Sequence, residues 1–550
     1  MELNLALNAK EYAFSIRTYI DNLRKNDSSE IIEIEDKVNL NYETTAYYLY
    51  LRKQNPVLFF RNIEQYNGFS LVTNLFGSEE RVAYLAGFHS VEEVIEKWSL
   101  VANDTGSEPI AVNYRREAFP QKIKGEELNL FDLPIPAHYS TDGSKTGYNR
   151  YITSGLTTTR DPENDDIINL SFARIQPFGR NRFAFDAGSH GHLWKYLSIS
   201  KERMEKLKMT VLIGPNPIFY LLAASFIDNE FAKASKIFDI NFCKGYLNDL
   251  PVPCDTEIAI EAEFMPDEAF DEGPFAEYAG YVGYDSTKFV AEAKSIIMKK
   301  NPIYYDIQPS NSGEHVNLFS IPRSSLVMRS IREALPKGPV YQVKWPHYGG
   351  RFIAFGYVDK PEPGLAKQLG ISILGSDPLW NKFVFINEGK AGLDIETALV
   401  NLAQERHFGG SNVTRISGSF VISSDPTRDK EGRSGKVVFI TGGKLGAFKK
   451  EINDGRVLLK SRKGSVLISH EREFENQKVN VIVPDDIDIK DPDQIGWAIA
   501  TRCNPDTDIE LEKDRITFLA TRKVPPVAEL PNGVKKKIER RIRLLSGRFH

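Results

Sequence analysis

Two glutamates that could transfer protons, Glu272 and Glu277, stand five residues apart in 268-EAFDEGPFAEYAGYVGYD-285, around a Gly-Pro pair and beside aromatic residues. No basic residue occurs between Lys244 and Lys288, so sequence neighbours do not neutralise them. General acid–base catalysis uses carboxyl groups whose pKa is raised by apolar surroundings or by a like charge. The pair is a candidate for this chemistry, although spacing alone favours a solvated surface turn.

An arginine in an apolar strand is the second candidate. Arg174 lies within the pattern 167-IINLSFARIQ-176, five residues after Asn169. On a regular strand this offset places the two side chains on opposite faces unless a bulge intervenes. A buried guanidinium needs a carboxylate or phosphate partner. The segment indicates an anion-binding arginine or, about equally, an edge-strand arginine paired at the surface.

Histidine and glutamate supply the remaining candidates. His190 and His192 lie in 189-SHGHLWKY-196, and paired imidazoles are common metal ligands, but this short pattern more often belongs to surface or structural histidines. Glu230 is a lone acid in an apolar helical pattern and by itself indicates an exposed helix charge. The sequence contains no GxGxxG after a strand, no Walker motif, no GxSxG and no HExxH.

Bulk properties indicate an ordinary globular protein of two to four domains. The chain has 550 residues, 41% hydrophobic and 26% charged residues, and a formal net charge of -4, which gives no electrostatic case for nucleic acid. The basic end, 535-KKKIERRIRLLSGRFH-550, is typical of a solvated amphipathic helix.

The sequence shows neither a signal-peptide pattern nor a membrane-spanning pattern. The N-terminal residues have no apolar core of signal-peptide length, and no run approaches a membrane span. Cys243, Cys254 and Cys503 are widely spaced and suit a reducing compartment. We therefore expect a cytoplasmic protein.

Periodicity predicts three regions that position these residues. Helical patterns at 8–28 and 92–103 with strand patterns at 56–63 and 69–77 predict an N-terminal α/β domain. Between 150 and 310, short strand patterns dominate and helical pattern appears only near 192–208 and 217–237, which predicts a β-barrel-like central domain. After 310, helices and strands alternate again. We expect domains at 1–125, 126–312 and 313–550.

Taken in order along the chain, the motifs resemble the UbiD family of decarboxylases, which use prenylated FMN. The resemblance spans about residues 55 to 505, and its Asn-x4-Arg and Glu-Gly-Pro-Phe-x-Glu patterns are specific in combination. The segments that carry it are 74-NLFGSEERVAYLAG-87, 132-DLPIP-136, 151-YITSGLTTTRDPE-163, 169-NLSFAR-174, 189-SHGH-192, 229-NEFAKA-234, 272-EGPFAEYAGY-281 and 484-PDDIDIKDPDQIGWAIATRCNP-505.

The resemblance implies an α/β multidomain fold with a central split β-barrel that binds prenylated FMN, and a homo-oligomer, either dimer or hexamer. It implies a divalent metal, Mn²⁺ or Mg²⁺, held by Asn169, His190 and Glu230, with K⁺ as a further candidate. It also implies a flavin prenyltransferase as cofactor supplier. The cofactor-binding residues carried over are Asn169, Leu170, Ser171, Phe172, Ala173, Arg174, Ser189, His190 and Glu230.

The same resemblance assigns Arg174, Glu272 and Glu277 as the catalytic trio of a non-oxidative decarboxylase. The substrate would be an aromatic or α,β-unsaturated carboxylic acid, and the modified flavin would act as electron sink. Glu277 would donate the proton, Arg174 would hold Glu277 and the substrate carboxylate, and Glu272 would tune Arg174. For both Asn169 and Arg174 to reach the flavin, we expect a bulge or twist near Phe172.

Several alternatives stay open. His192 is the second choice for the metal-binding histidine, and the lysine that family members offer the flavin phosphate has no clear match around 374–380. The late acidic loop at 485–488 fits an extra βα unit within 476–550 or a shifted alignment. The chain could run in the carboxylating direction, as a carboxylase subunit, or be a non-catalytic flavin-binding or assembly subunit of a complex.

Overall fold

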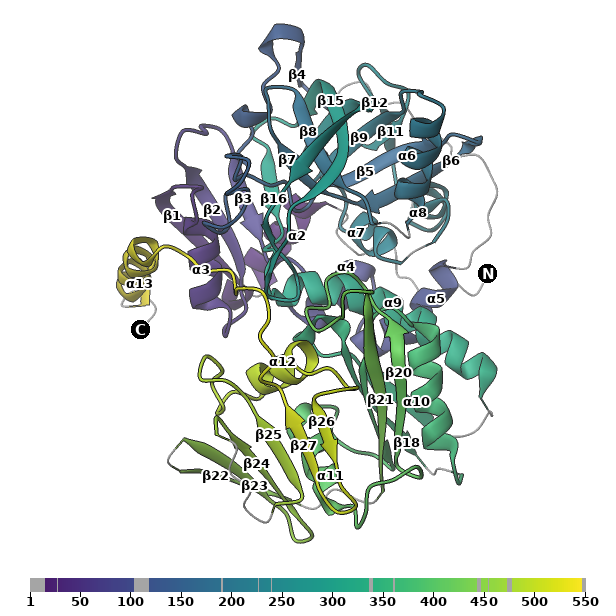
Figure 1. Ribbon diagram of the computed structural model, residues 1–550. Helices are drawn as coiled ribbons and strands as arrows, with labels where there is room; N and C mark the ends of the chain where they lie inside the picture. Colours follow the sequence, from purple (N-terminus) through teal and green to yellow (C-terminus); the bar gives the residue numbers. More distant parts are fainter. Residues whose placement is uncertain are drawn as a thin grey trace. The chain divides into compact units, whose positions relative to one another are not determined.

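The computed structural model describes residues 15–26, 28–102, 118–188, 191–225, 227–238, 240–335, 340–359, 362–442, 447–453, 455–471 and 477–546. The chain divides into two compact units (Figure 1). Unit 1 comprises Met1–Ala276, Val282–Arg323 and Val527–His550, and unit 2 comprises Glu277–Tyr281 and Ser324–Pro526. The C-terminal residues Val527–His550 thus group with the N-terminal part of the chain, and the domain bounds expected from the sequence stay a prediction.

A four-stranded sheet with strand order β1-β2-β3-β16 forms the first layer of unit 1. The apolar start of β2 is buried, as its strand pattern predicts. The last strand comes from far along the chain and pairs in parallel with β3. The elements are α2 (Ile16–Asn26), β1 (Ile31–Val38), α3 (Glu43–Leu51), β2 (Val57–Ile63), β3 (Ser70–Thr73), α4 (Glu79–Ala86), α5 (Val91–Ala102) and β16 (Ile303–Asp306).

An eight-stranded sheet forms the rest of unit 1, with the order β6-β5-β9-β12-β15-β8-β7 and β4 paired to β15. Its longest strands, β12 and β15, pair antiparallel over most of their length (Figure 1). Its strands are β4 (Gln121–Lys124), β5 (Leu156–Asp161), β6 (Asn164–Phe172), β7 (Arg174–Pro177), β8 (Arg182–Asp186), β9 (Lys208–Ile213), β12 (Ile258–Glu272) and β15 (Ser286–Met298).

The edge strands of this sheet, β6 and β7, follow one another in the chain, with only Ala173 between them. The Ala173 amide still donates to the Gly155 carbonyl at 3.3 Å, in register with the β5–β6 ladder, whereas Arg174 pairs with Asp186 of β8. The bulge or twist expected near Phe172 stays a prediction, but at Ala173 the chain passes from pairing with β5 to pairing with β8. It brings the two ends of the strand order together, so the sheet curves back toward itself.

Short elements complete unit 1. They are α6 (His192–Glu202), α7 (Ile218–Ala223), α8 (Glu230–Phe238), the pair β10 (Phe242–Lys244) and β11 (Pro251–Pro253), the pair β13 (Phe275–Ala276) and β14 (Val282–Gly283), and α13 (Asn532–Ser546). Helix α9 (Gly313–Ala334) begins in unit 1 and ends in unit 2.

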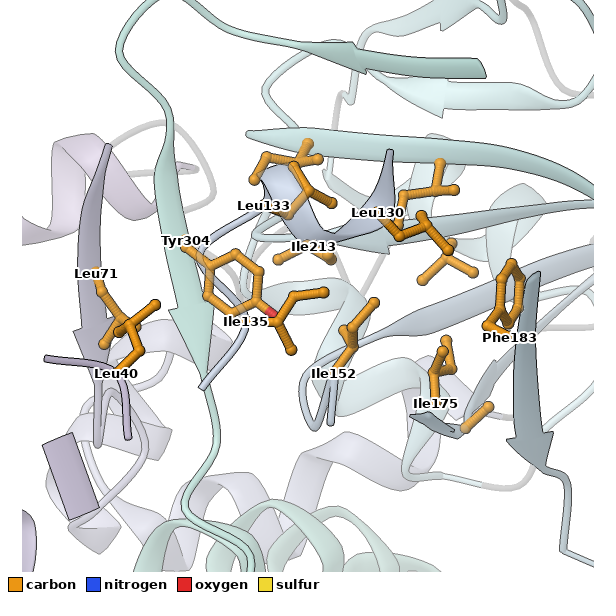
Figure 2. Close-up of a cluster of buried hydrophobic side chains, with 14 of the residues drawn as sticks. Leu40, Leu71, Leu130, Leu133, Ile135, Ile152, Ile175, Phe183, Ile213 and Tyr304 are labelled. Atoms are coloured by element: carbon orange, nitrogen blue, oxygen red, sulfur yellow. The ribbon is translucent and has the colours of Figure 1, made fainter. Parts of the chain in front are cut away.

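One hydrophobic core joins the two sheets of unit 1. Figure 2 shows Leu71 of β3 and Tyr304 of β16 at one end of this cluster and Phe183 of β8 at the other. Ile135 and Ile152, which precede β5 in the chain, are buried between them. The chain before β5 is thus part of the core and fixes the two sheets against each other.

Unit 2 contains two further sheets. The five-stranded sheet has the order β17-β18-β19-β21-β20, and the six-stranded sheet has the order β22-β23-β24-β25-β27-β26. The strands are β17 (Val340–Lys344), β18 (Ile353–Asp359), β19 (Phe383–Glu388), β20 (Val413–Phe420), β21 (Arg433–Gly442), β22 (Lys449–Asn453), β23 (Arg456–Lys460), β24 (Ser465–Ser469), β25 (Val479–Ile482), β26 (Ile509–Leu511) and β27 (Ile516–Leu519).

Helices α10 (Leu365–Ser376), α11 (Ile395–Gln404) and α12 (Pro492–Arg502) cover these sheets. Strand β19 is followed by α11, and strand β25 is followed by α12. Helix α12 begins with Asp491 as N-cap and Pro492 at its first position, which is the usual arrangement at a helix start.

The cysteines differ from the sequence expectation. Cys243 and Cys254 form a disulfide across the β10–β11 pair, with their Cα atoms 5.0 Å apart, whereas the sequence analysis had taken all the cysteines to suit a reducing compartment. Cys503 is free and buried. Among the helices of the described ranges, none is both long and apolar enough to cross a bilayer.

Candidate active site

An arginine–glutamate pair forms the centre of the candidate site. The Nε and Nη2 atoms of Arg174 donate to the two carboxylate oxygens of Glu272 at 2.8 and 2.7 Å. The Glu272 side chain is fully buried and that of Arg174 is 14% exposed. A two-point bond of this kind fixes the plane of the guanidinium as well as its position. The surface-turn interpretation of Glu272 was therefore wrong.

The local folding of the chain explains this meeting. Arg174 is the first residue of β7, just after the break at Ala173, and Glu272 is the last residue of β12. Gly273 follows with φ +107°, a conformation that favours glycine, and a Cβ there would lie 3.1 Å from the Asp285 Cα atom. The turn directly after Glu272 therefore needs a glycine.

A second carboxylate shares the arginine. Asp186 is directly opposite Arg174 across the β7–β8 ladder, and its Oδ2 lies 3.2 Å from Arg174 Nη2. Lys288 pairs with the same carboxylate. Burial opposes ionisation of Asp186, but Arg174 and Lys288 prevail and hold its pKa below the ordinary value. Sequence reasoning missed Asp186, although its position at the end of a strand rich in aromatic residues was a usable signal.

The ring of Phe275 covers the guanidinium. Its centroid lies 4.6 Å from the Arg174 Cζ atom, which is a cation–π distance. Tyr151 packs on the same ring at 4.6 Å between centroids. Burial and then Glu272 raise the pKa of Tyr151, so its hydroxyl stays protonated. These rings exclude water from one side of the pair.

Asp142 is a buried carboxyl group beside this centre. Its two oxygens accept the backbone N–H groups of Ala276 at 2.9 Å and Tyr139 at 3.1 Å. Burial raises the pKa of Asp142 to about 7. Nearby, His138 and Asp306 form a fully buried pair at 2.9 Å. Sequence reasoning passed over all three groups, because none of them belongs to a motif of the sequence.

Two of the three predicted metal ligands are buried on neighbouring elements. Asn169 on β6 and Glu230 at the start of α8 are each 2% exposed, and Glu230 Oε2 accepts the Leu170 N–H at 3.1 Å. Burial raises the pKa of Glu230 to about 8. The amide nitrogen of Asn169 donates to Ser171 at 2.9 Å, whereas its buried Oδ1 has no hydrogen-bond partner among the described residues. The expectation that Glu230 is an exposed helix charge was wrong.

This donor set fits a hard divalent cation. An orphaned amide oxygen and a buried carboxylate are oxygen ligands of the kind that Mg²⁺ and Mn²⁺ prefer. The third predicted ligand, His190, and the predicted flavin contact Ser189 lie outside the described residues. The alternative histidine, His192, is 39% exposed in its side chain and pairs with Asp228 at 3.2 Å. No group of three or more His, Cys, Asp and Glu side chains capable of holding a metal occurs within the described ranges.

The remaining predicted residues have different surroundings. Leu170 and Ala173 are buried in the sheet, and the Phe172 ring lies 5.9 Å from that of Tyr220. Glu277 is half-buried and belongs to unit 2. Its N–H donates to the Tyr281 carbonyl at 2.7 Å, and its own carbonyl accepts the Gly280 N–H at 2.9 Å. Glu277 therefore lies at the start of a closed turn.

Three family descriptions match most of the chain. They are the 3-octaprenyl-4-hydroxybenzoate carboxy-lyase N-terminal domain at residues 21–98, the Rift-related domain of the same enzyme at 112–312 and its C-terminal domain at 466–526. The chain thus belongs to the UbiD family and is a carboxy-lyase.

Individual relatives are distant. Anhydromevalonate phosphate decarboxylase of Methanosarcina mazei is 25% identical over 323 residues, 58% of this chain and 70% of the relative. Phenolic acid decarboxylase of Bacillus subtilis is 27% identical over 264 residues, 46% of this chain and 55% of the relative, so the match spans about half of that enzyme.

The fold matches a solved enzyme of the same class. The structure of the UbiD-class enzyme HmfF from Pelotomaculum thermopropionicum in complex with FMN superposes with a TM-score of 0.70 at 24% identity, covering 79% of this chain and 95% of that one. An evolved dimeric form of HmfF in complex with prFMN superposes with a TM-score of 0.68 at 22% identity, covering 80% and 97%. These likenesses show a shared mixed α/β multidomain fold.

Proposed function

We propose that this carboxy-lyase is a non-oxidative, prenyl-FMN-dependent decarboxylase of an aromatic or α,β-unsaturated carboxylic acid. The observation that carries the proposal is the buried two-point pair of Arg174 and Glu272, together with the buried oxygen ligands that Asn169 and Glu230 offer. The relatives act on carboxylic acids by their names, and HmfF binds FMN and prFMN. The central sheet, whose edge strands join at Ala173, would be the split barrel around the cofactor.

Arg174 has the properties of a carboxylate-binding residue in this reaction. Glu272 and Asp186 hold the guanidinium against Phe275, so it keeps one orientation before substrate arrives. Such preorganisation lowers the cost of orienting a substrate carboxylate for loss of CO₂. The prenylated flavin supplies the electron sink when bound.

Glu277 is the proposed proton donor to the product carbon, and Glu272 the residue that keeps Arg174 in place. Microscopic reversibility gives the same residues the opposite tasks at high bicarbonate, where the enzyme would carboxylate. Asn169 and Glu230, with His190, would hold Mn²⁺ or Mg²⁺ at the cofactor phosphate, and K⁺ is a further candidate cation. We also propose a homo-oligomer, dimer or hexamer, supplied with cofactor by a flavin prenyltransferase.

The cofactor assignment is tested by co-expression with a flavin prenyltransferase. The purified protein should show flavin-like absorbance and release a compound with the mass of prenyl-FMN. Absence of both would overturn the proposal. The metal assignment is tested by Glu230→Ala and Asn169→Ala, which should lower bound Mn²⁺ and flavin together, whereas unchanged metal content would remove these residues from the ligand set.

The role of Glu277 is tested by Glu277→Gln. This variant should bind prenyl-FMN normally and lose turnover by about 100-fold or more, because general acids contribute 10²–10⁴-fold. Glu268→Gln, a change at a partly exposed acid of β12, is the control and should keep its activity. Wild-type turnover in Glu277→Gln would exclude Glu277 as the donor.

A non-catalytic flavin-binding or assembly subunit is the second candidate. The Arg174–Glu272 pair argues against it, since a scaffold has no use for two buried charges that cost desolvation energy. A carboxylase subunit differs only in direction and partners. Product analysis with and without bicarbonate on the isolated chain separates these functions.

A further inference from the structure

Helix α12 holds the turn that follows Glu277. The indole Nε1 of Trp497 donates to the Ala279 carbonyl at 2.8 Å, and the Trp497 ring stacks on Tyr281 with 5.1 Å between centroids and 17° between planes. Gly280 lies between these contacts with φ +99°, and a Cβ there would be 2.8 Å from the indole. Only glycine allows the turn to approach Trp497 this closely.

The hydroxyl of Tyr281 makes a second set of contacts at the end of the same helix. It lies 2.9 Å from Thr501 Oγ1 and accepts from Arg502 Nε at 3.0 Å. Asp486 binds the two other nitrogens of that guanidinium at 2.7 and 2.5 Å. The acidic loop and helix that the sequence singled out at 484–505 therefore act together on Tyr281.

Tyr278 fixes the other side of the turn. Its hydroxyl lies 2.6 Å from Ser424 Oγ, and its ring is 5.6 Å from that of Trp380. A Cβ on Gly350 would lie 3.2 Å from the Tyr278 ring, so the backbone of unit 2 approaches it closely. The residues after Glu277 are thus bound to unit 2 at Tyr278, Ala279 and Tyr281.

We propose that Trp497, Thr501 and Arg502 are positioning residues for Glu277. This inference rests on the proposed role of Glu277 as proton donor. A donor must lie within a fraction of an ångström of its productive place, and a misplacement of about 1 Å can cost about 100-fold in rate. The turn from Glu277 to Tyr281 is short, so α12 determines where its first residue lies.

Two variants test the proposal on the holoenzyme. Trp497→Phe keeps a stacking ring and removes the N–H that binds Ala279, and Tyr281→Phe removes the hydroxyl that binds Thr501 and Arg502. In each we expect kcat per bound flavin to fall about tenfold or more, with KM within about twofold and normal flavin content. The solvent deuterium isotope effect on kcat should rise, because proton delivery becomes the slow step.

Amide hydrogen exchange gives a readout independent of activity. The Glu277 and Gly280 N–H groups close the turn, and both should exchange faster in Trp497→Phe and Tyr281→Phe. Trp345→Phe is the matched control. It loses an equivalent indole bond in unit 2, from Nε1 to Asn381 Oδ1 at 2.7 Å, and should change neither the turn's exchange nor the isotope effect.

The outcomes separate this inference from the proposed function. If Glu277→Gln is inactive while both variants keep wild-type kcat, isotope effect and turn exchange, the positioning role is wrong and the donor role stands. If Glu277→Gln is fully active, the donor role fails first. A fall in kcat matched by lost flavin, with an unchanged isotope effect, would also overturn the proposal, since it indicates general destabilisation.

Discussion

At the scale of the residue, the candidate site gathers charged side chains in a buried place, where removing them from water costs free energy. Arg174 is shared by Glu272 and Asp186, and Asp186 is shared with Lys288. Buried ion pairs add little stability compared with apolar residues of similar size, but losing one partner is costly. The cluster therefore makes sense as a device that presents Arg174 in one orientation.

Glu272→Gln tests this reasoning through stability. The variant leaves Arg174 with one formal charge partner fewer in a buried place, so we expect unfolding free energy to fall by about 3 kcal/mol. Glu268→Gln disrupts a partly exposed pair with Arg182 and should cost about 1 kcal/mol or less. Urea unfolding of both variants at neutral pH measures the difference. Equal losses would show that the Glu272 pair is energetically an ordinary surface pair.

Asp142 provides a pH-dependent prediction. Because burial raises its folded pKa to about 7 from 3.8, the folded protein keeps a proton that the unfolded chain releases. Its contribution to stability is complete below about pH 4 and is lost as pH rises to about 7. One such group changes unfolding free energy by about 1.4 kcal/mol per pH unit. Between pH 5 and pH 8, the unfolding free energy of Asp142→Asn should therefore fall by about 3 kcal/mol less than that of the wild type.

Urea unfolding of wild type and Asp142→Asn at both pH values gives this double difference. Asp271→Asn, a change at an exposed acid, serves as the control and should leave the pH dependence as in wild type. Parallel pH profiles for wild type and Asp142→Asn would show that Asp142 does not titrate in this range.

Site residues could be predicted from the sequence where they belong to a motif, but not where their role depends on burial in the folded chain. Arg174, Glu272 and Asn169 were singled out from their motifs, whereas Asp142 belongs to no motif and Asp186 is marked only by the aromatic strand before it. Their importance comes from a ladder register and a packed loop, which are tertiary features.

At the scale of the element, the periodicity of the sequence predicted strands and helices well, but it did not predict which elements pair or pack with one another. The pattern at 167–176 predicted a strand, and the structure divides it at Ala173 so that β6 and β7 pair with different partners. The burial of Glu230 depends on α8 packing against β6, which no helical pattern reveals.

The disulfide of the β10–β11 pair should stabilise the folded protein. Its disulfide joins cysteines 11 residues apart, and closing a loop of this size should stabilise the folded state by about 2–3 kcal/mol. Cys243→Ser with Cys254→Ser should lower unfolding free energy by that amount, and dithiothreitol should lower the wild-type value to match. Cys503→Ser is the control for dithiothreitol sensitivity. Peptide mapping without reductant that finds all three thiols free would contradict the cross-link.

At the scale of the whole molecule, distant segments complete the N-terminal part of unit 1. Strand β16 extends its sheet, and α13 packs against α3 (Figure 1). Lys537 and Arg541 of α13 both bind Glu43, which is 3% exposed. The sequence predicted an amphipathic terminal helix, but not where this helix packs, because its partner Glu43 lies almost 500 residues away in the chain.

Removing residues 527–550 tests whether α13 stabilises unit 1. It would leave buried Glu43 without two cations and uncover the core contacts of Leu530 and Ile538, so unit 1 should lose stability. We expect faster amide exchange in α3 and unchanged exchange in α10 and α11, which lie in unit 2. Lys535→Ala with Lys536→Ala, which changes exposed charges of the same helix, is the control and should leave α3 as in wild type. Equal protection of α3 in truncated and full-length protein would show that α13 is not part of the unit 1 core.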